Sequence, residues 1–155
     1  MKNIYLLLPI LILSACSNDN KSTPINISLL TTIFINLKDN QGNDLLNTEN
    51  YVSNNIKIFY VNNSLATEIN DTNLDNPKGF LIFTSGTNLK MKLFLNHNEE
   101  EFPITYIKWN ATDTDTIKAH YYRTDSSVLL DKVWINNVLT TPLDSNSGIE
   151  FNILK

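Results

Sequence analysis

Apolar and polar residues alternate with a period of two along most of this chain. In the stretch 89–95, leucine and methionine occupy every second position, and lysine takes two of the positions between them. Successive side chains of a strand point to opposite faces, so this alternation indicates strands with one buried face. No segment of ten or more residues repeats its apolar positions at the helical period of 3.6. The pattern therefore predicts an all-β protein.

The alternating stretches are short, and polar residues typical of turns separate them. We expect roughly eight to ten strands, which is typical of an antiparallel β-sandwich, immunoglobulin-like or related. The expected strands cover residues 33–37, 56–61, 65–69, 80–83, 89–95, 105–109, 116–122, 128–135, 138–141 and 149–154. Between 45 and 54 the pattern is irregular and leaves room for one short helical turn. On the aromatic-rich hairpin the expected inward residues are Ile107, Trp109, Ile117, Ala119 and Tyr121.

Two asparagine pairs are expected at hairpin turns. Asn62-Asn63 and Asn136-Asn137 both follow an aromatic and a β-branched residue, and both are followed two residues later by leucine. Two-residue hairpin loops need positive φ, which asparagine adopts at lower cost than most residues. The similar segments fit either a duplicated half-domain or two hairpins that use the same kind of turn independently. We favour the second interpretation.

The first sixteen residues follow a different pattern. Lys2 precedes an apolar run over 4–13, and the small residues Ser14 and Ala15 then lead to Cys16. A basic start, a short apolar run and small residues before a cleavage point mark a secretory signal peptide. The run is shorter than the roughly 20 apolar residues that cross a bilayer, and it contains a proline.

The residues Leu13-Ser14-Ala15-Cys16 resemble the lipobox of bacterial lipoproteins at all four positions. With its general composition, the chain resembles the small lipoproteins of the Bacteroidota. The resemblance implies cleavage before Cys16, acylation of this cysteine and attachment to the membrane through the lipid. By the same resemblance, serine at position 17 favours the outer membrane, on its periplasmic or its surface side.

These features divide the chain into three parts. Residues 1–15 are the expected signal peptide, and residues 16–27 are the lipidated cysteine with a polar, flexible tether. Residues 28–155 are long enough for one β-sandwich domain with its own core. The expected location is therefore the cell envelope.

Charge and composition narrow the range of partners. The formal net charge is −4, and a cleaved leader would make it one unit more negative, because the leader holds one lysine and no acid. Nucleic-acid binding needs a basic surface, so the charge argues against such a partner. With the one cysteine acylated, no disulfide is available, and no motif in the chain indicates a cofactor.

Two histidines are the candidate general bases near neutral pH, His97 and His120. Ser126, His120 and Asp125 can be drawn as a catalytic triad, although no Gly-x-Ser-x-Gly motif accompanies them. We expect no catalysis. A small envelope hydrolase that uses His120 or His97 is the alternative function.

Asp113 and Asp115 form the one candidate cation site, with Asp125 as a third ligand across the hairpin. The glycine and the distal glutamate of a calcium loop are absent, and aspartates that bond their own turn explain the pattern as well. We expect no metal site, and calcium at Asp113 and Asp115 stays open. Asp115-Thr116-Ile117 also resembles the short O-glycosylation acceptor of secreted Bacteroidota proteins.

Aromatic residues give the remaining signal for a site. Tyr106, Tyr122 and Trp134 are placed by the alternation on the face opposite the core, where they could contact a glycan or a protein partner. If loops cover both faces of the sandwich, these side chains are structural instead. We therefore expect a lipid-anchored envelope protein with a binding or structural role. A passive surface-layer component without a ligand is a third possibility.

Overall fold

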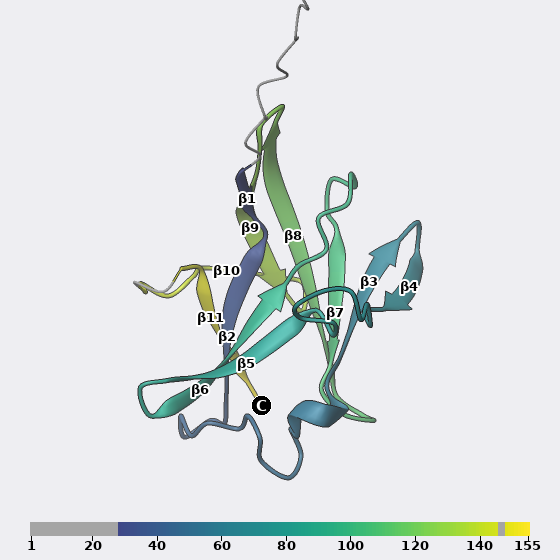
Figure 1. The fold of residues 1–155 in the computed structure, drawn as a ribbon. Helices are drawn as coiled ribbons and strands as arrows, with labels where there is room; N and C mark the ends of the chain where they lie inside the picture. The colour runs from purple at the N-terminus through teal and green to yellow at the C-terminus, as the bar shows by residue number, and fades with distance from the viewer. Residues whose placement is uncertain (1–27, 146–147) are drawn as a thin grey trace, which may run out of the picture.

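Two β-sheets pack against each other in the computed structural model, which describes residues 28–145 and 148–155 (Figure 1). Sheet A has seven strands: β1 (Ser28–Leu30), β3 (Lys57–Asn62), β4 (Leu65–Glu68), β7 (Ile104–Lys108), β8 (Thr114–Thr124), β9 (Ser127–Ile135) and β10 (Val138–Thr140). Sheet B has four: β2 (Thr32–Lys38), β5 (Phe80–Ser85), β6 (Asn88–Phe94) and β11 (Glu150–Leu154). The all-β, sandwich-like prediction is confirmed.

The strands of sheet A follow the order β1-β9-β8-β7-β3-β4, with β10 also paired to β9, and those of sheet B follow β11-β2-β6-β5. A single 3-10 turn, η1 (Ser53–Asn55), is the only helical segment in the described part of the chain. It overlaps the irregular stretch where one helical turn was expected. Within residues 28–145 and 148–155 no helix is long and apolar enough to span a membrane.

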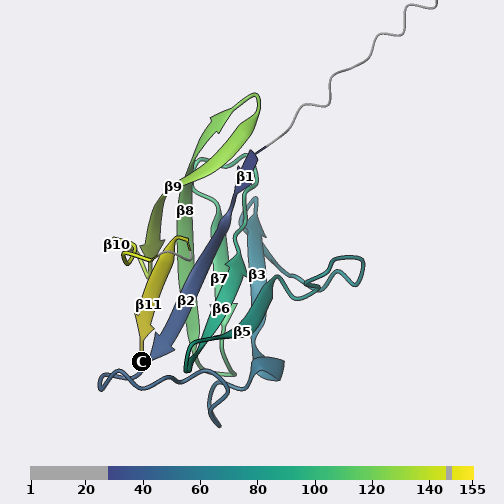
Figure 2. The ribbon, with the colours of Figure 1, turned by 60° about the vertical axis from the view of Figure 1, so that its left-hand side comes forward.

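Most neighbouring strands pair antiparallel, as expected, but both sheets are mixed because each contains one parallel pair. β1 pairs with β9 in parallel, and β2 pairs with β11 in parallel. A single residue, Thr31, separates β1 from β2, and the chain passes from sheet A to sheet B at this point (Figure 2). One continuous path therefore pairs with a different strand in each sheet. Hydrophobic periodicity reports which face a strand buries and contains no information about the direction of its neighbours.

The core lies between the sheets and is built by alternate residues of each strand. All five residues expected to face inward on the β7–β8 hairpin are buried, at most 5% exposed. They pack with alternate residues of sheet B in one cluster, which includes Ile33, Ile35, Leu37, Met91, Leu93, Phe151 and Ile153. Since the even-numbered residues of β8 alternate with this set, their side chains point away from the core.

The asparagine turns were half correctly predicted. Asn136 and Asn137 have φ of 51° and 68°, as expected for the loop between β9 and β10. In the other hairpin the positive φ values belong to Asn63 and Ser64, at 50° and 66°, while Asn62 pairs with Leu65 inside the strands.

Asn62 contacts a residue outside its own hairpin. The side-chain oxygen of Asn62 accepts a hydrogen bond from the amide of Asn98, and the register of β3 with β4 places the loop one residue later. The two similar segments thus turn at non-equivalent positions. This difference is what two independently formed hairpins would give.

Candidate functional site

The three aromatic residues singled out from the sequence all lie on the outer face of sheet A. Tyr106 on β7 pairs with Phe59 on β3 and Thr116 on β8, and the buried Thr105 and Ile107 flank it. Trp134 on β9 lies opposite Lys118 on β8. Tyr122 is 64% exposed at the far end of β8. The strand alternation therefore places these rings on the side away from the core.

Four side chains on this face form a connected group, which we call the aromatic cluster: Phe102, Lys118, His120 and Trp134. The rings of Phe102 and Trp134 meet edge to face with centroids 5.7 Å apart, and Phe102 also lies 5.6 Å from the ring of His120. The Lys118 ammonium is 4.8 Å from the Trp134 centroid and 5.7 Å from that of Phe102. Such cation–π contacts hold the ammonium in place without neutralising its charge.

Phe102 was missed by the sequence reasoning. It lies in the loop before β7, directly after the acidic residues 99–101, and belongs to no alternating stretch. Its side chain is 38% exposed and folds over the outward residues of β8. Only the residue type, a large aromatic in a polar loop, could have drawn attention to it.

His120 does have an acidic partner, but not the one expected. Its Nδ1 lies 2.9 Å from the carboxylate of Asp131 on β9, at a register shift between His120 and Tyr121. The hydrogen bond with His120 keeps the pKa of Asp131 below its ordinary value. Asp125 and Ser126 form the loop at the tip of this hairpin, and Thr124 lies four positions, about 13 Å, along the strand from His120. The triad drawn from the sequence is therefore not assembled.

His97 is not paired with a carboxylate that could orient it as a base, among the residues that the structure describes. Its Nδ1 lies 3.2 Å from the carbonyl oxygen of Leu95, two residues earlier in the chain. It borders a hollow of about 480 Å³ whose other walls include Tyr60, Leu74 and Phe94. Burial raises the pKa of Tyr60 to about 12, and its hydroxyl donates to the carbonyl of Phe94. Among the described residues no carboxylate forms an ion pair with His97.

The candidate calcium ligands hold a cation that belongs to the chain itself. The Lys155 ammonium lies 2.7 Å from one carboxylate oxygen of Asp113 and 2.7 Å from one of Asp115. The buried Asp115 also accepts from the indole of Trp109 at 2.6 Å and from the amide of Asn136 at 2.7 Å. Burial lowers the pKa of Lys155, but the hydrogen bonds to both aspartates outweigh it and raise the pKa overall.

This arrangement ties the end of sheet B to the end of sheet A. Asp125, the proposed third ligand, lies beyond the opposite end of β8, about 30 Å along the strand. The described residues contain no group of three histidine, cysteine or acidic side chains placed to hold a metal ion. Thr116, the glycosylation candidate, is a strand residue whose backbone N–H donates to Asn136, and the aspartate before it is buried.

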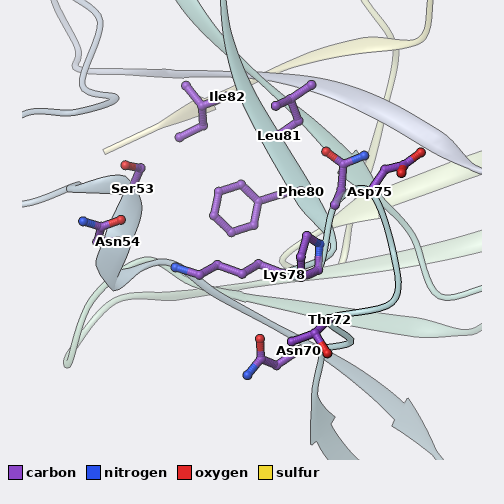
Figure 3. Close-up of a pocket in the computed structure, with 11 residues that line it drawn as sticks. Ser53, Asn54, Asn70, Thr72, Asp75, Lys78, Phe80, Leu81 and Ile82 are labelled. Atoms are coloured by element: carbon purple, nitrogen blue, oxygen red, sulfur yellow. The ribbon is translucent and has the colours of Figure 1, made fainter.

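A groove of about 520 Å³ lies at the edge of sheet B, beside β5 (Figure 3). Phe80 and Ile82 of β5 line it together with Ser53 and Asn54 of η1, and the loop before β5 closes it with Asp75 and other polar residues. The groove contains none of the aromatic residues named above. Nothing in its lining brings a base and a nucleophile together.

A second hollow, of about 410 Å³, lies on the outer face of sheet A itself. It is lined by Asn54, Asn55, Lys57, Phe59, Lys108, Asn110 and Ala111. Phe59 is paired to Tyr106, so this hollow lies beside the ring of Tyr106, at the end of the face opposite Tyr122. The outer face of sheet A thus combines aromatic rings, amides and lysines over several strands.

Cys16 and the leader lie outside the described residues. Comparison of the chain with protein-family models, with curated proteins and with solved structures finds no match.

Proposed function

We propose that this protein is a lipid-anchored binding module of the cell envelope, whose outer face of sheet A contacts its partner. The observation that supports this most strongly is the aromatic cluster with the exposed Tyr122 beside it. Clustered aromatic residues are common centres of binding surfaces because they bury much area and lose little conformational freedom. A cluster outside the core contributes less to folding than the same rings would inside it.

The lipid on Cys16 is the second part of the proposal. Two or more acyl chains give stable attachment, since each buried CH₂ contributes about 0.8 kcal/mol. The polar residues 17–27 would act as a tether between lipid and domain. A tethered domain meets envelope glycans and proteins at high effective concentration, so even modest affinity at its face is useful.

The envelope hydrolase is the competing function, and one contact favours it. The His120–Asp131 bond has the geometry of a base with its orienting carboxylate. Against it, the ring of Phe102 packs on His120, and no serine, threonine or cysteine side chain of the described residues bonds to this histidine. We therefore assign His120 to the binding face.

The binding test uses the full chain, fluorescently labelled, on intact cells of its native host. Tyr122→Ala should weaken binding by about 1 kcal/mol or more, a factor of about five. Leu154→Ala is the matched control, because Leu154 is 61% exposed on the outer face of sheet B. Equal binding of wild type and Tyr122→Ala would leave the passive surface component as the better description. Loss of a hydrolytic activity in His120→Ala would favour the enzyme.

The anchor has a separate test. Cys16→Ala should move the protein from the membrane fraction to the soluble fraction of host cells. Mass spectrometry of the mature wild-type protein should find acyl chains on Cys16. An unmodified thiol there would remove the lipid anchor from the proposal and leave the binding face to be judged by the Tyr122 experiment.

A further inference from the structure

The strands of sheet A turn more lysines than acids outward, and Glu99, Glu100 and Glu101 lie in the loop before Phe102. The strands β3, β4, β7, β8 and β9 turn four lysines and two acids outward on this face: Lys57, Lys108, Lys118, Lys132, Glu68 and Asp131. The chain as a whole has a formal net charge of −4. An excess of lysine along these strands of an acidic protein favours contact of an acidic partner with the strands themselves.

Two of these lysines have no acidic partner. Lys57 pairs with Glu68 at 3.0 Å, and Lys132 lies 3.6 Å from Asp131, which also contacts His120. Lys108 and Lys118 form no ion pair within residues 28–145 and 148–155. Lys118 is held over the rings of Trp134 and Phe102, and Lys108 lines the 410 Å³ hollow with Phe59.

The two lysines without an acidic partner, Lys108 and Lys118, are separated along the direction of the strands. Lys108 is paired with Thr114 of β8, and Lys118 lies four residues further along that strand. Strand geometry puts their Cα atoms about 14 Å apart. The aromatic rings of Tyr106 and Trp134 lie between and beside them. A ligand that uses both cations must therefore be extended, with negative charges at intervals and apolar faces between them.

We infer that the outer face of sheet A binds an acidic polysaccharide, with its carboxylates or sulfates at Lys108 and Lys118 and its sugar rings against the aromatic residues. This rests on the proposed function and names the partner of the same face. The C–H faces of sugar rings pack on aromatic side chains, and the amides of Asn54 and Asn55 supply hydrogen bonds for hydroxyls in the hollow.

The experiment measures binding of the full chain, in detergent, to immobilised polygalacturonate, dextran sulfate and uncharged dextran. We expect binding to at least one of the two acidic polymers, at least about tenfold weaker binding to dextran, and loss of affinity as the salt concentration rises. Lys118→Gln and Lys108→Gln should each weaken binding about three- to fivefold, and the double variant more than either.

Lys92→Gln is the matched control. Lys92 also lies over an aromatic ring, that of Phe94 at 5.3 Å, but on the outer face of sheet B. It should bind like the wild type. An equal loss in Lys92→Gln would mean that overall charge and not this face attracts the polymer, and would overturn the inference.

Three further results would overturn it. Binding to neither acidic polymer would do so, and so would equal binding to dextran. Equally tight competition by polyglutamate or by a single-stranded oligothymidylate would assign the face to an acidic peptide or a nucleic acid instead. If the polymers fail while Tyr122→Ala still weakens binding to host cells, only the acidic-glycan inference fails and the proposed function stands.

Discussion

The outer faces of the two sheets differ in how deeply their charged side chains are buried. On sheet B, Glu150 is only 5% exposed and accepts hydrogen bonds from Lys90 at 2.8 Å, Asn36 at 2.7 Å and Ser145 at 2.7 Å. Gly148, just before β11, packs so closely that an added Cβ would lie 3.0 Å from the ring of Phe34. This face is partly covered by its own chain.

On sheet A the ion-paired side chains of Lys57, Glu68, Lys132 and Asp131 stay 40–55% exposed. The Lys118 ammonium lies over two aromatic rings and forms no ion pair among the described residues, where Tyr122 has no hydrogen-bond or ring partner. A buried charge must be paired within the fold because its desolvation is costly, whereas an exposed one keeps its water and can exchange it for a ligand. The comparison therefore separates a structural charged site from one that is available for binding.

The largest expected effect is at the covered site. Lys90→Met leaves the Glu150 carboxylate buried without its cation and should lower the free energy of unfolding by about 3–5 kcal/mol. Lys92→Met, two residues along the same strand, removes a lysine without an ion pair and should change it by less than about 1 kcal/mol. Urea denaturation measures both. Equal effects of the two variants would mean that the ion pair with Glu150 does not stabilise the fold more than an unpaired lysine does.

The same site predicts the acid stability. Burial raises the pKa of Glu150, but hydrogen bonds from Lys90, Asn36 and Ser145 outweigh it and lower the pKa from 4.5 to about 2. A carboxylate with a depressed folded-state pKa contributes stability above its unfolded pKa and loses it as the pH falls. About 3 kcal/mol should be lost between pH 5 and pH 2. In Glu150→Gln this part of the pH dependence should disappear, and an unchanged profile would contradict the assignment.

Sequence reasoning found the parts of the fold that depend on neighbouring residues. Alternation identified the inward set on the β7–β8 hairpin, including the large Trp109, because burial of one face has period two. The same alternation placed Tyr106, Tyr122 and Trp134 on the outer face. The parallel partner of β2 was missed, since pairing with β11 joins residues more than 100 positions apart.

For the candidate site, the sequence likewise identified single residues but not their partners. The histidine and the aromatic residues were recognised by type, but their partners come from other strands. Asp131 reaches His120 only because the β8–β9 register shifts at that point, and Lys155 reaches Asp113 only because sheet B ends beside sheet A. Glu150 drew no attention because its burial depends on packing that no local pattern reports.

The packing of the segment before β11 on the outer face of sheet B can be tested at Gly148. Gly148→Ala should cost about 1–3 kcal/mol, because φ of 120° is strained for alanine and its Cβ would press on Phe34. Gly86→Ala also has positive φ, 63°, but its Cβ would meet nothing within 4 Å. The difference between the two, from thermal unfolding, contains the contact with Phe34 together with the greater backbone strain at φ of 120°. No difference would mean that this segment does not press on sheet B.

On sheet A the corresponding test is the β3–β4 loop. Asn63→Gly should be neutral or stabilise the fold by up to about 1 kcal/mol, since glycine reaches positive φ without steric cost. Asn63→Val should destabilise by about 1–2 kcal/mol because a β-branched residue is strained there. If Asn62→Val had the larger effect of the two valine variants, the loop would lie one residue earlier than described.

The smallest expected effect on stability is at Tyr122. Tyr122 and its neighbour Tyr121 are the same residue type on opposite faces of β8. Tyr121 is buried, its hydroxyl donates to the carbonyl of Asn96 at 3.0 Å, and burial raises its pKa well above the ordinary value. Tyr121→Phe should therefore cost about 1 kcal/mol through the lost hydrogen bond.

Tyr122→Ala removes a much larger group, yet it should change the free energy of unfolding by no more than about 0.5 kcal/mol, because the side chain is 64% exposed. Urea denaturation of the two variants gives the comparison directly. A loss above 1 kcal/mol in Tyr122→Ala would make this ring part of the folded structure and would weaken the case for the outer face of sheet A as a binding surface. A neutral variant that no longer binds host cells would separate binding from stability at a single residue.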